Sequence, residues 1–501
     1  MTSIDIRAYL TLIGLLFACP TMSLLFSLPT ELLLAVIDAM DSDSDSLRHF
    51  AVTCKLACLL TEPILYRTLL VTSGSEASRL AQALQQHRAD FVQSLDLRPQ
   101  YRGEEGIEDF TPTISVMTHL RSLSVESPFA NYGRWHHSES RWEVITGAFR
   151  ALFQSAQSGV GLQSLESLEI HWTGDGSELW MLTEFKPILA LPALRSLTIS
   201  SAAIVAEDWG VNEGTTALHH LELIECFVTG RGLYAVLSLP RALRSCHLGQ
   251  LRHTRRDVEN ARGHEEASPK EQLDALRSQR HALQSLVWKD AGFSHSSDGV
   301  PYVAMSTSGS PGLSDFTELH TLTLDGHCAF FLSLLLSDRA PPNLHRLRLV
   351  WHDNGVIFDV LPAHGGSTSI PNIPHPEALL RYLPTLRHLD VVLSPVGSSS
   401  LSALWENEAR RDRVRQLSGE LRARGVQFCV YMAWRGPGLV PPYLFGEYVP
   451  VEKSVYEYRG EVDWFGDAVS VRVPRTRAPA GVEQDSDSEW EDDSQSEEDS
   501  E

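Results

Sequence analysis

Two clusters of residues have the types and spacing that metal or thiol chemistry needs. His219, His220 and Glu222 are close together, and His220 and Glu222 would point to one side of a strand, where both could ligate a metal ion. Cys54 and Cys58 are about one helical turn apart. The plainer interpretation is a set of solvated strand residues in the first case and two core thiols on an apolar helix face in the second.

Known catalytic motifs are missing from the chain. The sequence contains no G-x-x-x-x-G-K-[ST], no H-E-x-x-H and no G-x-S-x-G. We therefore expect no catalytic residue, no metal site and no cofactor, and we predict that the chain is not an enzyme.

The composition is that of a globular, acidic chain. Its 501 residues are 43% hydrophobic and carry a formal net charge of -22. This charge argues against a nucleic-acid backbone or an anionic membrane as the main partner, because both would be repelled. Seven cysteines, an odd number without a C-x-x-C pair, are typical of buried thiols in a reducing compartment. We expect a cytoplasmic or nuclear protein whose partners are proteins.

Residues 1–21 form an apolar leader that has two interpretations. Arg7 is followed by a mostly apolar run over 8–18 and then by Pro20, which is the outline of a signal peptide and is too short to span a bilayer. Such a leader would make the chain a secreted or membrane-associated recognition protein. Alternatively the leader is dispensable, since Met22 could begin a self-sufficient domain, and the rest of the sequence favours this interpretation.

The middle of the chain repeats the pattern L-x-x-L-x-L, with other apolar residues allowed at the last place. Ten copies occur, and five of the nine intervals between them are 24 to 29 residues long, as in leucine-rich repeats. In "LHHLELIECFV", Cys226 stands where such repeats have Asn or Cys. The fourth residues of the copies are at positions 95, 123, 168, 197, 221, 246, 286, 322, 347 and 389.

Apolar helical segments such as "FKPILALPALRSL" alternate with these copies. Alternation of a helix with a short parallel strand produces an open, curved stack. We therefore predict an α/β fold in which residues 72–432 form a leucine-rich-repeat-like solenoid (horseshoe) that ends with a strand over 426–430.

Four insertions interrupt the repeat, and loops of this kind commonly carry binding residues. Aromatic residues dominate protein interfaces, so Tyr132, Trp135 and Trp142 are our candidates for contact with a protein target. The alternative is a loop that folds back on the flank of the solenoid. The insertions cover residues 129–142, 252–280, 291–315 and 352–378.

The segment "SLPTELLLAVIDAM", residues 27–40, predicts a helix that is apolar on nearly all sides. Pro29 favours a helix start, and between residues 32 and 40 only Asp38 is polar. An apolar stripe over 46–60 predicts a second helix, and Pro63 is expected to end it. A unit this small cannot cover so much apolar surface by itself, so we expect it to bury the remainder against another protein.

Residues 28–71 also resemble an F-box. The resemblance rests on Leu28-Pro29-x-Glu31-Leu32, on the segment Val52-x-Cys54-Lys55 and on the closing P-x-L-Y-R. It implies a helical domain over 22–71 that binds the Skp adaptor of a cullin-RING ubiquitin ligase, with the solenoid as receptor for an unknown protein target. The alternative is a repeat scaffold, capped by these helices, that has no ubiquitin role. The implied adaptor-binding residues are Leu28, Pro29, Glu31, Leu32, Ile37, Leu47 and Val52.

The C-terminal part changes character twice. Residues 433–484 are rich in aromatic residues and proline, and they are either a capping extension on the last repeat or a segment that awaits a partner. Residues 485–501 hold ten acidic residues and are predicted to be disordered by self-repulsion. This tail is either a tunable electrostatic arm for a basic partner or a solubilising segment. Its candidate phosphorylation sites, which resemble those of acidophilic casein-type kinases, are Ser486, Ser488, Ser494 and Ser496.

Overall fold

The structure is a computed structural model, and contacts within the chain divide it into two compact units. The first consists of residues 1–61 and 476–501, and the second of residues 62–475. The residues that the structure describes are 28–40, 43–99, 103–127, 142–172, 179–205, 208–250, 264–289, 311–325, 329–351, 376–393, 408–433, 443–446, 448–460, 462–465 and 472–474.

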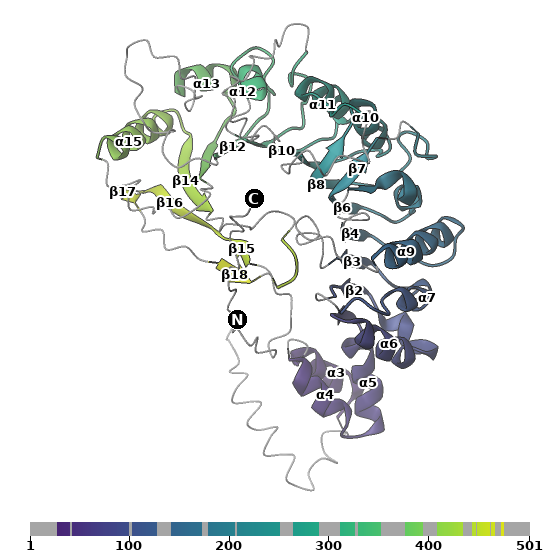
Figure 1. Cartoon of the computed structure of the whole chain (residues 1–501). Helices are drawn as coiled ribbons and strands as arrows, with labels where there is room; N and C mark the ends of the chain where they lie inside the picture. Colours follow the sequence, from purple (N-terminus) through teal and green to yellow (C-terminus); the bar gives the residue numbers. More distant parts are fainter. Residues whose placement is uncertain are drawn as a thin grey trace, which may run out of the picture. The chain divides into compact units, whose positions relative to one another are not determined.

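Helices α3 (Thr30–Ala39), α4 (Ser44–Ala51) and α5 (Lys55–Leu65) make up the described part of the first unit, and α5 continues into the second (Figure 1). Pro29 is the N-cap of α3, and its carbonyl accepts hydrogen bonds from the amides of Leu32 and Leu33 at 3.0 and 3.2 Å. The Asp43 carboxylate accepts hydrogen bonds from the amides of Asp45 and Ser46 in the first turn of α4. A short acidic side chain therefore starts this helix inside the predicted spacer.

The prediction of one helical stripe over 46–60 is wrong, because the chain turns between α4 and α5. The Thr53 hydroxyl donates to the Phe50 carbonyl at 2.7 Å, which competes with continuation of the helix. The Cys54 sulfur then accepts a hydrogen bond from the Ala57 amide at 3.4 Å and satisfies a free donor at the start of α5. Apolar spacing alone does not reveal this local break.

The chain beyond this turn also differs from the sequence prediction. Pro63 lies inside α5, two residues before its end, and does not terminate it. The following residues, Thr68–Val71, form strand β1 and pair in parallel with Ser94–Leu97. The end of the segment that resembles an F-box is therefore already part of the sheet.

The second unit is mixed α/β and is built on an open sheet of mostly parallel strands (Figure 1). Its main path runs β1-β2-β3-β4-β6-β8-β9-β10-β11-β12-β13-β14-β16-β17, with β5 and β7 beside it, and β15 pairs separately with β18. The strands after β1 are β2 (Ser94–Leu97), β3 (Ser122–Glu126), β4 (Ser167–His171), β5 (Trp180–Met181), β6 (Ser196–Ser200), β7 (Ala202–Ile204), β8 (His220–Val228), β9 (Ser245–Gln250), β10 (Ser285–Lys289), β11 (Thr321–Asp325), β12 (Arg346–Trp351), β13 (His388–Leu393), β14 (Gln427–Ala433), β15 (Tyr448–Pro450), β16 (Glu452–Arg459), β17 (Val462–Phe465) and β18 (Arg472–Pro474).

Helices connect the parallel strands and lie along one side of the sheet (Figure 1). This arrangement is compatible with the predicted solenoid. The α-helices are α6 (Gly74–Ala83), α7 (Thr111–Ser115), α9 (Trp142–Gln157), α10 (Gly230–Ser238), α11 (Pro269–Leu276), α12 (Ala329–Leu335), α13 (Pro376–Tyr382) and α15 (Glu408–Arg422), and the 3-10 helices are η1 (Gln86–Phe91), η2 (Glu108–Phe110), η4 (Leu182–Ala190) and η6 (Arg277–Gln279).

The fourth residues of the ten sequence repeats form one continuous buried column across the sheet. Each is paired with the fourth residue of the next copy, from Leu95 on β2 to Leu389 on β13. Leu69 on β1 and Phe428 on β14 extend the column at its two ends. All of these side chains are buried, so the repeated leucine marks the helix-covered face of every strand.

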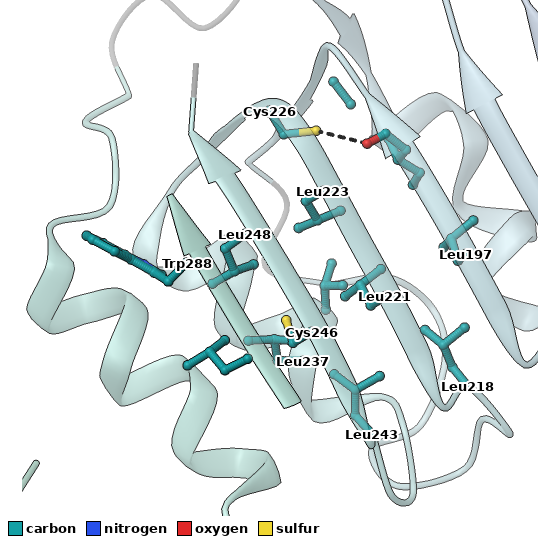
Figure 2. Packing of buried hydrophobic residues seen from close by; sticks show 14 of the residues in the cluster. Leu197, Leu218, Leu221, Leu223, Cys226, Leu237, Leu243, Cys246, Leu248 and Trp288 are labelled. Atoms are coloured by element: carbon teal, nitrogen blue, oxygen red, sulfur yellow. Dashed lines mark hydrogen bonds between the residues drawn. The ribbon is translucent and has the colours of Figure 1, made fainter. Parts of the chain in front are cut away.

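In the core at β6 to β10, two cysteines occupy positions of the repeat pattern (Figure 2). The sulfur of Cys226 lies 3.6 Å from the Ile199 carbonyl of the neighbouring strand, as a hydrogen-bonded turn residue should. Glu225 just before it has a φ of 52°, so the chain bends there. Cys246 replaces leucine in the buried column, and burial raises the pKa of its thiol to about 12.

An antiparallel hairpin continues the sheet beyond the last parallel strand. β16 pairs antiparallel with β14, and β17 pairs antiparallel with β16. Buried Tyr456 contacts the ring of Phe428 with centroids 5.9 Å apart. Of the two interpretations of residues 433–484, the hairpin part therefore corresponds to a capping extension on the last repeat.

Two neighbouring residues on β10 allow the assignment of the buried face to be tested through the free energy of unfolding. Leu286 belongs to the buried column, whereas Val287 is only partly buried on the other face. We expect Leu286→Ala to lower the free energy of unfolding by about 2 to 5 kcal/mol and Val287→Ala by about 1 kcal/mol or less. Urea denaturation monitored by circular dichroism measures both values. Equal losses would contradict the assignment of faces.

Candidate protein-binding surfaces

The first unit exposes large apolar side chains on α3 and α5, just before α3 and just after α4. We call Leu28, Leu32, Leu34, Val52, Leu56 and Leu59 the N-terminal apolar surface; their exposed fractions range from 36% for Leu28 to 83% for Val52. They make up six of the eleven large hydrophobic residues that are exposed in the described part of the chain. Such a concentration within residues 28–59 is typical of a binding surface.

Helix α3 has two apolar sides, and only one of them is buried. Leu33 and Ile37, four residues apart, are at most 2% exposed. Leu32, Ala35 and Ala39 lie on the opposite side with helical spacing, and all three are exposed. This explains why the sequence of α3 has no polar face.

The structure divides the predicted adaptor-binding residues into two sets. Ile37 and Leu47 are buried, so their side chains contribute to the core of the unit and offer no surface. The exposed set consists of Leu28, Pro29, Glu31, Leu32 and Val52.

Sequence reasoning missed three members of the N-terminal apolar surface. Leu34 is 40% exposed, and Leu56 and Leu59 are 43% and 64% exposed on α5. The only signal for the α5 residues was the apolar content of the second stripe. Because that stripe was taken as one continuous helix, Leu56 and Leu59 could not be assigned to the outer side.

The face of the sheet without helices is polar along most of its length. Serine or threonine often precedes the repeated leucine, and a charged or hydroxyl-bearing residue often follows it, as in "SLDL", "SLEI" and "TLTL". We call this side the strand face. It offers hydrogen-bonding groups on a support held in register by the strand ladder.

A buried ion-pair network occupies the strand face at β2, β3 and β4. The Arg98 guanidinium contacts the carboxylate of Glu126 at 2.9 Å, that of Asp96 at 3.5 Å and that of Glu169 at 4.0 Å. The amide of Phe445 donates to Glu126 at 2.8 Å, and the Arg98 guanidinium lies over the Phe445 ring, 5.7 Å from its centroid. The C-terminal extension therefore contacts the strand face at Glu126, a residue more than 300 positions earlier in the chain.

The same network contains three potential metal ligands. Ligand atoms of Glu126, Glu169 and His171 all lie within 4.8 Å of one another. Arg98 contacts both carboxylates, so the chain supplies a compensating positive charge itself. The sequence cluster of His219, His220 and Glu222 lies elsewhere, and its ligand atoms do not form such a group. The Glu222 carboxylate lies 3.9 Å from His247. Burial, and the charge of Arg244, lower the pKa of His219.

Several predicted residues are outside the part of the chain that the structure describes. These are Tyr132 and Trp135, the leader over 1–21, and the four serines of the tail, Ser486, Ser488, Ser494 and Ser496. Trp142 is the first residue of α9, but its side chain is not described. Within the described ranges, none of the helices has both the length and the apolar character that crossing a membrane requires.

Comparisons with known proteins add little to this picture. No protein-family model and no curated protein matches the chain. Among solved structures, an internalin from Listeria monocytogenes is similar, with 14% sequence identity and a TM-score of 0.16. The match covers 50% of this chain and 87% of that chain. A TM-score this low carries no argument about fold or function, so the proposal below depends on the residues themselves.

The strand face also holds a histidine that stays neutral. Burial, and to a lesser degree the charge of Lys289, lowers the pKa of His247 to about 3. Glu222 would favour the charged form, but its half-exposed carboxylate is 3.9 Å away and is the weaker influence. His247 is therefore uncharged at physiological pH.

This histidine makes stability depend on pH. The folded-state pKa is below the ordinary value of 6.5, so the unfolded chain binds more protons and stability falls as the pH drops below about 6.5. Between pH 7 and pH 5 we expect the wild type to lose about 2 kcal/mol more unfolding free energy than His247→Gln. Urea titrations of both proteins at the two pH values measure the difference. An equal loss in both would contradict a partly buried, neutral imidazole.

Proposed function

We propose that the chain is the substrate-recognition subunit of a cullin-RING ubiquitin ligase in the cytoplasm or nucleus. In this proposal the N-terminal apolar surface binds a Skp-type adaptor, which connects the chain to the cullin. The strand face of the leucine-rich-repeat-like solenoid binds the protein target. The chain performs no chemistry itself and acts by holding the target near the transferring subunits.

The N-terminal apolar surface is the observation that carries this proposal. Burying one leucine-sized side chain contributes about 1.5 to 3 kcal/mol, so its six residues can contribute on the order of 10 kcal/mol. Association itself costs about 4 to 15 kcal/mol, which a surface of this size can offset. Six exposed large apolar side chains within one short helical unit fit a stable partner better than they fit solvent.

The resemblance to an F-box supplies the identity of that partner. Leu28, Pro29 and Leu32 belong to the opening motif of the resemblance, and Val52 belongs to its second segment, Val52-x-Cys54-Lys55. All four are exposed, as residues that contact an adaptor must be. A scaffold whose helices only cap the repeats has no need for exposed leucines on α3 and α5, so the ligase role is favoured.

Affinity purification of the full chain tests the proposal. We expect the wild type to recover a Skp-type adaptor and a cullin, and the double variant Leu32→Glu, Val52→Glu to lose at least about 90% of both, because each change places a charge in an apolar contact. Mass spectrometry of the recovered proteins gives the ratios. Both positions are exposed, so the variant should keep its fold, which circular dichroism verifies.

A matched control uses an exposed valine elsewhere in the chain. Val160 is 57% exposed and lies in the turn after α9, so Val160→Glu should recover both proteins like the wild type. If the wild type recovers neither adaptor nor cullin, the ligase role is refuted, and an interaction scaffold remains as the interpretation. Equal loss in the control would show that the effect is not local.

A further inference from the structure

A pocket of about 480 Å³ lies on the strand face between β9 and β14. We call it the basic pocket, because Lys289, Arg346 and Arg348 line it together with the hydroxyl-bearing Thr321 and Thr323. The ladder places Thr321 beside Arg346 and Thr323 beside Arg348. Register alone therefore brings these donors to one place.

The charge of the basic pocket is opposite to that of the chain. Three cationic side chains and one carboxylate, that of Glu452, line it, within a protein of formal net charge -22. Arg346 contacts the buried carboxylate of Asp390 at 2.6 Å, and this fixes the orientation of its guanidinium. The side chain of Arg346 is still 44% exposed, so it can serve an external ligand as well.

Glu452 shows which chemical group the basic pocket accepts. This residue begins β16, and its carboxylate pairs with Arg348. The Arg348 guanidinium also lies over the Tyr431 ring, 5.6 Å from its centroid, which holds it in place. A carboxylate from the capping hairpin thus occupies one part of a pocket that is large enough for several further groups.

We infer that the basic pocket binds an acidic segment of the protein target, with a carboxylate or phosphate group against Arg346, Arg348 and Lys289. Arginine and threonine donors suit both groups, and phosphate offers more acceptor oxygens. Nucleic acid is disfavoured by the overall charge. The inference deepens the proposed function by naming the chemistry of its target, but binding to the pocket needs no adaptor.

A direct binding experiment on the full chain tests this inference. The probes are two fluorescein-labelled twelve-residue peptides of Ser and Glu, one with a central phosphoserine and one without, measured by fluorescence anisotropy. We expect both to bind, the phosphorylated peptide more tightly, and the double variant Lys289→Gln, Arg346→Gln to weaken binding about tenfold or more. Glu452→Gln removes the internal carboxylate and should strengthen binding severalfold.

The control variant removes a cation outside the basic pocket. Arg195 is exposed before β6, and Arg195→Gln should bind like the wild type. No binding of either peptide to the wild type, or equal affinities in all four proteins, would overturn the inference. Because Glu452→Gln must act in the opposite direction, misfolding of the double variant cannot imitate the expected pattern. Adaptor recovery is measured separately, so failure here leaves the ligase proposal standing.

Discussion

Parallel pairing of short strands with their leucines in register is the constraint on which the second unit depends. A strand of four to six residues has no partner for its backbone within itself, so each strand needs both neighbours. A shift by one residue would move the buried leucine to the strand face. The column from Leu69 to Phe428 shows that register is kept through twelve strands. Long insertions between strands leave this constraint untouched.

The same constraint decides what the sequence could predict. Repeated leucines are a local signal, so all ten positions and the turn role of Cys226 were readable from spacing. The break between α4 and α5 involves side-chain hydrogen bonds of Thr53 and Cys54, which periodicity does not contain. The contact between Phe445 and Glu126 joins residues more than 300 positions apart, and no local pattern encodes it.

The two candidate surfaces were predictable to different degrees. An apolar excess on α3 was visible in the sequence, but the assignment of Ile37 to the core and Leu32 to the surface required the fold. The basic pocket was not visible, because Lys289 and Arg348 come from repeats that are far apart in the chain. They line one pocket because β10, β11 and β12 pair side by side in the sheet. The two surfaces also differ in chemistry: one is apolar on short helices, and the other is charged on a rigid sheet.

The most direct test of the account is hydrogen–deuterium exchange of the full chain with and without a purified Skp-type adaptor. If the N-terminal apolar surface binds the adaptor, we expect slower exchange in peptides covering residues 28–40 and 52–60, with no change in the strands of the repeat. No protection of these two segments, at adaptor concentrations that saturate a working F-box protein, would contradict it. Protection confined to the strands would contradict it equally.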